Sequence, residues 1–121
     1  MSKELEDRFQ NYAIAVRDFC TRIKWDIINR EYIGQVIRAS GSVSANYTEA
    51  SDDLGKTDEK MKIKIARREA KESIKWLDLI LTYGDKELDK EKVVLIDEGN
   101  QIRKILSSII IKLESRKEKP N

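Results

Sequence analysis

Two glutamates lie at a spacing that can place paired carboxylates on one face of a helix. Glu69 and Glu72 are three residues apart in a stretch without helix breakers. Such a pair can contribute to a di-metal carboxylate site or to glycoside hydrolysis. The di-metal sites of helical bundles also use Glu-x-x-His motifs, however, and this sequence contains no histidine. We therefore expect Glu69 and Glu72 to be structural or surface residues.

Other reactive side chains are scarce. Without histidine, the usual general base near neutral pH and the commonest metal ligand are missing. The single cysteine, Cys20, rules out sulfur-rich metal sites, and its place beside Phe19 predicts burial. Residues 55–57 (Gly-Lys-Thr) resemble the end of a phosphate-binding loop but lack its upstream glycine. We expect no enzymatic activity, and no metal, cofactor or small-molecule substrate.

A line of polar residues follows one helical face between positions 38 and 49. Arg38, Ser42, Asn46 and Glu49 recur at steps of four, four and three. If this face meets the one with Glu69 and Glu72, Arg38 can form a charge-assisted hydrogen bond with a carboxylate. The pattern allows a structural polar network made of Arg38, Asn46, Glu49, Glu69 and Glu72. The alternative is a solvated charged face with occasional ion pairs.

Five cations form a stripe along the next predicted helix. Lys60, Lys64, Arg67, Lys71 and Lys75 are expected within a narrow arc, roughly opposite the apolar sector. A row of cations on a rigid helix can follow an RNA or DNA backbone by releasing counterions. The alternative is the ordinary solvated face of an amphipathic helix. The formal net charge of +2 neither demands nor excludes a polyanionic partner.

The same helix carries two apolar lines. The first is the seam of Ile63, Ala66, Ala70, Ser73, Leu77 and Ile80, and the second consists of Met61, Ile65, Trp76 and Leu79. Two adjacent lines make a wider apolar sector than one partner helix needs. We expect the second line to pack in a homo-oligomer.

Long helices must position these residues. The 121 residues include only five glycines and one proline. Apolar periodicity predicts helices over residues 3–26, 30–51, 58–83 and 86–116, joined by short turns. The predicted fold is all-α, a single domain over residues 1–121 that forms an antiparallel up-down-up-down four-helix bundle. The alternative is an array of helical hairpins that completes its core only by oligomerising.

Several local features carry further expectations. Gly41 weakens the helix over 30–51, and its small residues are expected to let another helix approach closely (Ser40, Gly41, Ser44, Ala45 and Thr48). Thr57 is expected to cap the third helix and Gly84 to end it. Gly99 indicates a bend or close packing. No signal peptide or membrane-spanning run is visible, which with the single cysteine favours a cytoplasmic location.

Two blocks of the sequence resemble a bacterial protein family. Residues 35–50 (QVIRASGSVSANYTEA) match its first block at Gln35, Arg38, Ser42, Ala45, Asn46 and Glu49. Residues 60–80 match its second block at Lys62, Ile65, Ala66, Glu69, Ala70, Glu72, Ser73, Trp76 and Leu77. The family comprises the four-helix-bundle proteins first noticed in intervening sequences of 23S rRNA genes. One departure is Tyr47-Thr48, where the family usually has Ile-Ala.

This resemblance implies a left-handed bundle that assembles into a homopentamer. A related branch comprises the accessory proteins of diversity-generating retroelements, in which basic bundle pentamers are associated with reverse transcriptase and nucleic acid. We therefore expect a non-enzymatic oligomeric bundle that contacts RNA or DNA through the basic face. The alternative is a protein–protein scaffold or self-assembling module that binds no nucleic acid.

Overall fold

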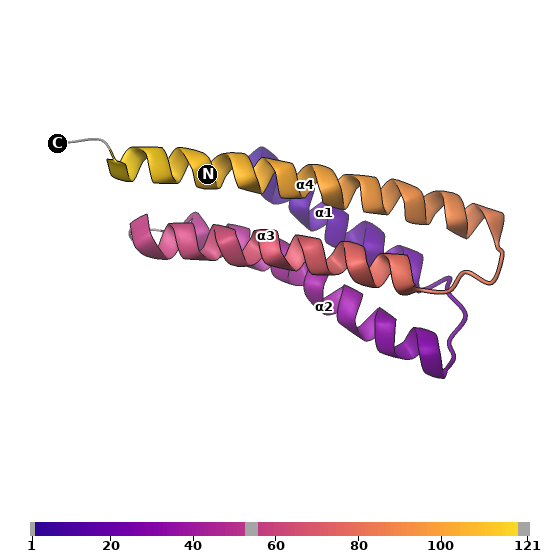
Figure 1. Cartoon of the computed structure of the whole chain (residues 1–121). Coiled ribbons are helices and arrows are strands. Elements are labelled where there is room, and N and C mark those ends of the chain that lie inside the picture. Colours follow the sequence, from indigo (N-terminus) through magenta and orange to yellow (C-terminus); the bar gives the residue numbers. More distant parts are fainter. Residues whose placement is uncertain (1, 53–55, 119–121) are drawn as a thin grey trace.

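The chain folds into a bundle of four α-helices. The computed structural model describes residues 2–52 and 56–118. The helices are α1 (Lys3–Cys20), α2 (Ile27–Ala50), α3 (Lys56–Leu79) and α4 (Lys86–Glu118) (Figure 1). Each helix packs against its neighbours in the chain, and α1 closes the ring against α4. The prediction of an all-α antiparallel four-helix bundle is confirmed.

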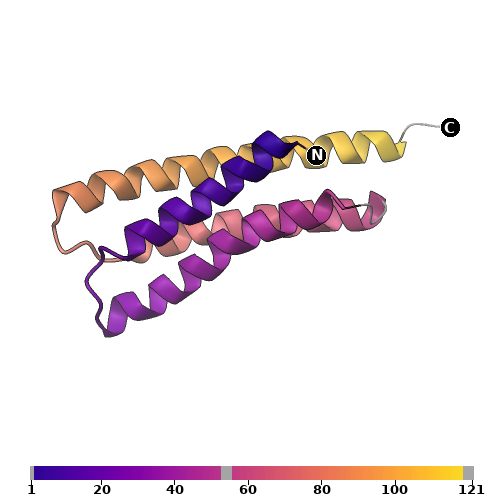
Figure 2. The same ribbon diagram turned by 180° about the vertical axis from the view of Figure 1, so that it is seen from behind.

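The helices differ in how closely they follow the bundle axis. In Figures 1 and 2 the N-terminal half of α2 angles away from the other three helices, whereas α3 and α4 run side by side. The longest helix, α4, has 33 residues and continues past the start of α1, which has 18. Over the residues described, none of the helices has the length and apolar character needed to cross a bilayer.

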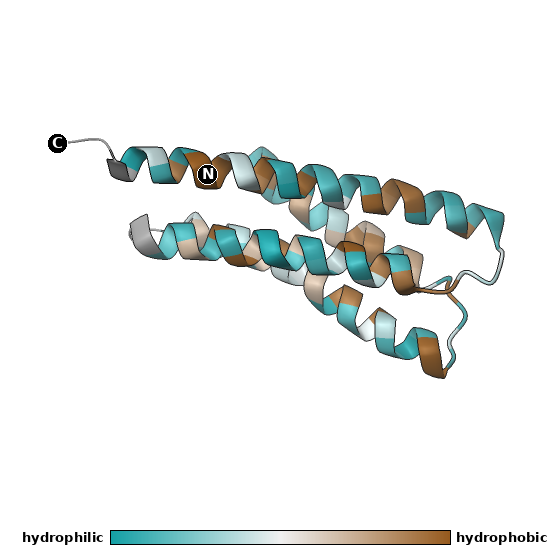
Figure 3. Ribbon diagram, in the orientation of Figure 1, coloured by the Kyte–Doolittle hydropathy of each residue, from teal (hydrophilic) through white to brown (hydrophobic). Residues whose placement is uncertain are grey.

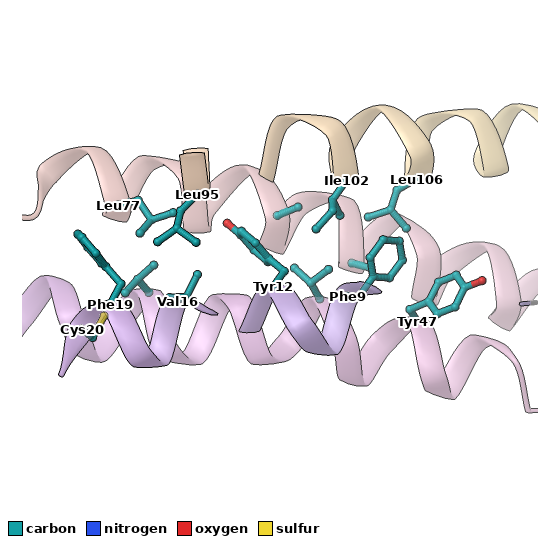
Figure 4. Close-up of a cluster of buried hydrophobic side chains, with 14 of the residues drawn as sticks. Phe9, Tyr12, Val16, Phe19, Cys20, Tyr47, Leu77, Leu95, Ile102 and Leu106 are labelled. Atoms are coloured by element: carbon teal, nitrogen blue, oxygen red, sulfur yellow. The ribbon is translucent and has the colours of Figure 1, made fainter. Parts of the chain in front are cut away.

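The predicted seams meet in the core (Figure 4). Phe9 of α1 packs edge-on against Tyr47 of α2, with ring centroids 4.8 Å apart. Leu77, Leu95, Ile102 and Leu106 close the core from α3 and α4. Hydrophobic and hydrophilic residues alternate in short bands along all four helices (Figure 3), the pattern of amphipathic helices that bury one face. Tyr12 and Ser73 add a polar contact inside this apolar region, their oxygens 2.7 Å apart.

The first helix ends earlier than predicted. It stops at Cys20, six residues before the expected end. The amides of Arg22 and Ile23 donate to the carbonyls three residues before them, as in a 3₁₀ turn, and no longer to those four residues before. Ile23 remains buried, so its apolar spacing reflects core packing in a turn. The next helix starts at Ile27, where the Asp26 carboxylate accepts hydrogen bonds from the amides of Ile28 and Asn29.

One buried amide joins two connections at the same end of the bundle. Asn29 of α2 has no exposed surface. Its Nδ2 donates to the carbonyls of Lys24 and Leu81, both at 3.0 Å, and its Oδ1 accepts from the amide of Leu81 at 2.9 Å. These bonds occupy the backbone of Leu81, and α3 ends at Leu79, four residues before the predicted end. Gly84 lies in the following turn with φ +79, where glycine is unstrained, and does not border the helix.

Two further predictions about helix ends and glycines are wrong. The third helix already includes Lys56, so Thr57 lies inside it and does not cap it; the expected turn residue Gly55 lies outside the described residues. A Cβ on Gly41 would have no atom within 4 Å, so no helix approaches closely there. Of the small residues in α2 expected at a helix contact, only Ser40 is buried, because the core face of α2 passes through Val36, Val43 and Tyr47.

Gly99 of α4 does mark close packing. A Cβ built there would lie 2.8 Å from both Ile74 Cγ1 and Tyr12 Oη. Real Cβ atoms do not approach other atoms this closely, so glycine is what allows α4 to sit against α1 and α3 at this level. The polar contact between Tyr12 and Ser73 lies beside the same point.

Candidate nucleic-acid interface

An open groove runs between α3 and α4 and is lined mainly by cations. Its central depression, of about 360 Å³, is bordered by Lys64, Arg67, Arg68, Lys71, Arg103 and Ser107. Neighbouring depressions add Asn100 and Lys104 on one side, and Ile74, Lys75, Asp78 and Ile96 on the other. Two helices therefore contribute positive charge to one continuous surface, which we call the basic groove.

The predicted basic stripe lies along this groove. Lys60 and Lys64 approach Glu114 of α4 at 3.9 and 3.8 Å, and Arg67 donates to Ser107 Oγ at 3.4 Å. Lys71 and Lys75 are exposed farther along. The stripe thus lies beside α4, whereas the sequence placed it roughly opposite the apolar sector. In the second apolar line of α3, Trp76 packs against the edge of the core, and Met61 and Leu79 are exposed. The packing of this line in a homo-oligomer stays a prediction.

Three cations of the basic groove were not singled out in the sequence. Arg68 belongs to α3, and Arg103 and Lys104 belong to α4. The sequence does place the α4 residues of the groove on one helical face, because Asn100, Arg103 and Ser107 follow at steps of three and four. This spacing points to a shared site only when α4 is known to lie beside the cationic edge of α3.

Most of the positive charge in the groove is unpaired. Arg103 Nη1 donates to Asn100 Oδ1 at 3.2 Å, a neutral partner. Among the side chains of residues 2–52 and 58–116, no carboxylate comes within 4.0 Å of the charged nitrogens of Arg68, Lys71, Lys75 or Lys104. Acids occur at its two ends, with Glu114 near Lys64 and Asp78 beyond Lys75. The unneutralised charge is therefore confined to the middle of the groove.

The opposite edge of α3, which faces α2, has its charges paired. Arg38 Nη1 donates to Glu69 Oε2 at 2.9 Å and Nη2 donates to Glu72 Oε2 at 3.1 Å. Burial acts to lower the pKa of Arg38, but the charge of Glu69 and the hydrogen bonds to both glutamates outweigh it and raise the pKa. The Glu69 side chain is only 8% exposed, and Arg38 is its ion-pair partner.

The other two residues of the predicted polar network lie outside this cluster. Glu49 forms an ion pair with Lys62 at 2.6 Å, which also links α2 to α3. Asn46 Nδ2 donates to the Ser42 carbonyl of its own helix at 2.8 Å and bridges no helices. The structure therefore separates the five residues into an Arg38–Glu69–Glu72 cluster, one ion pair and one local hydrogen bond.

The second apolar line of α3 lies on the outer surface near α2. Trp76 stacks on Tyr32 of α2, with ring centroids 6.0 Å apart, and its buried Nε1 has no hydrogen-bond acceptor among the described residues. Met61 is 55% exposed, Leu79 is 36% exposed, and Ile65 is half-buried. A partly open apolar surface thus accompanies the Arg38–Glu69–Glu72 cluster.

A larger depression lies between α1 and α4 and has the opposite charge. Its volume is about 640 Å³, and its lining includes Glu4, Asp7, Asp97 and Glu98. Arg8 donates to Glu98 through Nε at 3.0 Å and Nη2 at 2.8 Å. Among the described residues, no three Asp, Glu or Cys side chains are placed to hold a metal ion.

The remaining reactive side chain is poorly placed for chemistry. Cys20 lies in the core, and burial raises the pKa of its thiol to about 11. The reactive thiolate is therefore scarce at neutral pH. Of the Gly55-Lys56-Thr57 stretch, Gly55 falls outside the described residues and the other two belong to α3.

A solved structure shares this fold. It is the crystal structure of a protein of unknown function from the S23 ribosomal protein family of Bacteroides thetaiotaomicron VPI-5482. The TM-score is 0.72 at 25% sequence identity, and the similarity covers 87% of this chain and 96% of that chain. Neither a protein-family model nor a curated protein matches the sequence. The helical-bundle fold is thus shared with a protein of that family over nearly its whole length.

Proposed function

We propose that this chain is a non-enzymatic, oligomeric bundle protein that contacts RNA or DNA through the basic groove. The observation that carries the proposal is the convergence of cations from α3 and α4 on one surface, whose middle holds no carboxylate among the described residues. Phosphates that displace counterions from such a surface bind without any need for base contacts. The proposal includes a cytoplasmic location, favoured by the single cysteine.

Sequence resemblance supports the same proposal. The two matched blocks resemble the 23S rRNA intervening-sequence family and, through it, the accessory proteins of diversity-generating retroelements. The solved structure with the same fold comes from the S23 ribosomal protein family and has unknown function. We propose that this chain belongs to that group of bundle proteins and shares their homopentameric assembly.

Charge reversal in the groove tests nucleic-acid contact. Arg68, Lys71 and Lys75 are replaced together by Glu, and binding to structured RNA and to DNA is measured at low salt by fluorescence anisotropy. The matched control replaces Lys24, Lys86 and Lys90 by Glu, three exposed lysines away from the groove. We expect at least a hundredfold loss for the groove variant only. No binding by the unmodified protein at low salt, or equal effects of both variants, would contradict the proposal.

The outer surface formed by α2 and α3 favours a second candidate function, a protein-binding or self-assembling scaffold. Trp76 is half-buried in its stack on Tyr32, and Met61 and Leu79 are exposed on the same line. Tyr and Trp side chains that are apolar with one polar tip are enriched at protein interfaces. Sedimentation velocity at micromolar concentration tests self-association, and a strict monomer would contradict both the scaffold by self-assembly and the oligomeric part of the first proposal.

A further inference from the structure

We infer that the basic groove binds the sugar-phosphate backbone of a duplex nucleic acid. It recognises neither the base sequence nor unpaired bases. This inference rests on the proposed function and specifies the class of nucleic acid that the groove takes.

The lining of the groove offers phosphate ligands and no stacking surface. Besides the cations it contains only Ser107, Asn100, Asp78 and two isoleucines, Ile74 and Ile96. Among the described residues, the aromatic side chains lie elsewhere: in the core, in the Tyr32–Trp76 stack beside α2, or at the connections near Trp25 and Tyr83. Single-strand-binding proteins gain affinity from each base that stacks on an aromatic side chain. This groove lacks that source of affinity, whereas a duplex keeps its bases stacked on one another.

The shape of the groove suits a convex ridge of phosphates. Base readout in the major groove needs a helix or ribbon that projects into the DNA. Here the cations line the valley between two helices that run side by side (Figure 1), so neither helix projects beyond the other. Arg67 and Arg103 are also held by hydrogen bonds to Ser107 and Asn100 within the valley. The backbone of a duplex, which forms the ridge between its grooves, is the part that can enter.

The charges match a short length of duplex. The cations of α3 from Lys64 to Lys75 span about 17 Å at 1.5 Å per residue. A duplex carries about one negative charge per 3.4 Å of axis on each strand, so one backbone ridge of this length presents about five phosphates. Among the described side chains, six cations of the groove have no carboxylate within ion-pair distance, namely Arg67, Arg68, Lys71, Lys75, Arg103 and Lys104. The cations and the phosphates of one ridge are therefore similar in number.

The test measures how tightly the intact chain binds two duplexes and their four single strands. Two 20-base-pair duplexes of unrelated sequence and their separate single strands, chosen not to fold, are titrated by fluorescence anisotropy between 50 and 200 mM salt. We expect each duplex to bind at least tenfold more tightly than its strands, and the two duplexes to differ by less than threefold. With four to six phosphates neutralised, the affinity for duplex should fall about 150- to 1,800-fold over this fourfold change in salt.

A matched pair of variants places the binding in the groove. Lys71→Gln combined with Lys104→Gln should lower the slope of log affinity against log salt by about two, one phosphate for each cation removed. Lys86→Gln combined with Lys90→Gln, at exposed positions near the start of α4, should leave the slope unchanged. An unchanged slope in the groove variant would overturn both this inference and the proposed function.

The remaining outcomes separate the two proposals. Single strands that bind as tightly as duplexes, or a tenfold preference between the unrelated duplexes, would overturn the duplex inference and leave nucleic-acid contact standing. Failure to bind any probe at 50 mM salt would overturn both. A preference for RNA over DNA duplexes, measured with matched sequences, is compatible with the inference because both present phosphate ridges.

Discussion

The two edges of α3 both carry charged residues, but these are unpaired on one edge and paired on the other. On the edge facing α4, the cations Arg68, Lys71 and Lys75 have no carboxylate within ion-pair distance among the described residues. On the edge facing α2, Arg38 holds Glu69 and Glu72 at 2.9 and 3.1 Å. One edge thus presents positive charge to solvent, and the other neutralises charge within the molecule.

This difference separates residues that stabilise the bundle from residues that are available to a partner. An exposed cation without a partner contributes little to the free energy of unfolding. A carboxylate as buried as that of Glu69 costs free energy when its partner is removed. Substitutions beside α2 should therefore change stability, and substitutions of exposed cations beside α4 should change binding alone.

Trp76→Ala should give the largest loss of stability. Truncation removes the ring that stacks on Tyr32 beside α2. A buried Trp→Ala change typically costs 3–5 kcal/mol, and because Trp76 is only partly buried we expect about 2–4 kcal/mol. Urea unfolding followed by circular dichroism at 222 nm measures it. Met61→Ala, at an exposed site on the same apolar line, is the control and should cost less than about 1 kcal/mol. Equal losses would show that Trp76 does not hold α2 to α3.

Gly99→Ala tests the close packing that lets α4 lie beside α3. The new Cβ would lie 2.8 Å from Ile74 Cγ1 and Tyr12 Oη, so we expect a net loss of about 1–3 kcal/mol. Gly41→Ala is the matched change, because its Cβ meets nothing within 4 Å, and it should gain about 0.5–1 kcal/mol from helix propensity. Thermal unfolding of both variants decides the point, and shifts of the same sign would contradict the packing described at Gly99.

Arg38→Ala compares the two edges directly. Removing the half-exposed Arg38 leaves the Glu69 carboxylate without its partner, at an expected cost of about 1–2 kcal/mol. Lys71→Ala, on the other edge, should stay within about 0.5 kcal/mol. Adding Glu69→Gln to Arg38→Ala should recover part of the loss, because the buried charge is then gone. A double variant no more stable than Arg38→Ala would show that burial of this charge is not what Arg38 offsets.

Tyr12→Phe probes the core between the two edges and should have the smallest effect. Ser73 Oγ donates to the Ala70 carbonyl at 2.7 Å, so the Tyr12 hydroxyl is the donor to Ser73. Loss of this bond should cost about 1 kcal/mol at pH 7.

The same variant has a pH dependence of known sign. Burial raises the pKa of Tyr12 from 10.0 to about 12. The neutral phenol therefore contributes its full stability below pH 10, and the contribution is lost as the pH rises through 12. The stability difference between the natural protein and Tyr12→Phe should shrink over that range in guanidinium unfolding. A constant difference from pH 8 to pH 12 would contradict the burial of the phenol.

The sequence was sufficient for the architecture because apolar periodicity reports which face of a helix is buried. Ile63, Ala66, Ala70, Leu77 and Ile80 of the predicted seam are all buried in the core. Helix ends were less predictable, because they depend on contacts distant in the chain. The bonds from Asn29 to Leu81, 52 residues away, have no local signature in the sequence around Leu79.

The candidate site was only half predictable, for a related reason. Spacing placed Lys64, Arg67, Lys71 and Lys75 on one arc of α3, but could not give the direction of that arc. Direction depends on which neighbour each edge of α3 meets, and that is set by the packing of α2 and α4 on α3. Arg103 and Lys104 entered the site only through the packing of α4 on α3.

The buried amide of Asn29 has a consequence for the motions of the bundle. The amide N–H of Leu81 lies outside any helix in a residue that is 39% exposed, yet it is held by the side chain of Asn29. Exchange of that hydrogen with solvent requires the Asn29 side chain to break its hydrogen bonds, which also frees the carbonyl of Lys24. The connections before α2 and after α3 should therefore open together as one unit of local unfolding, and slow exchange at Leu81 would be its signature.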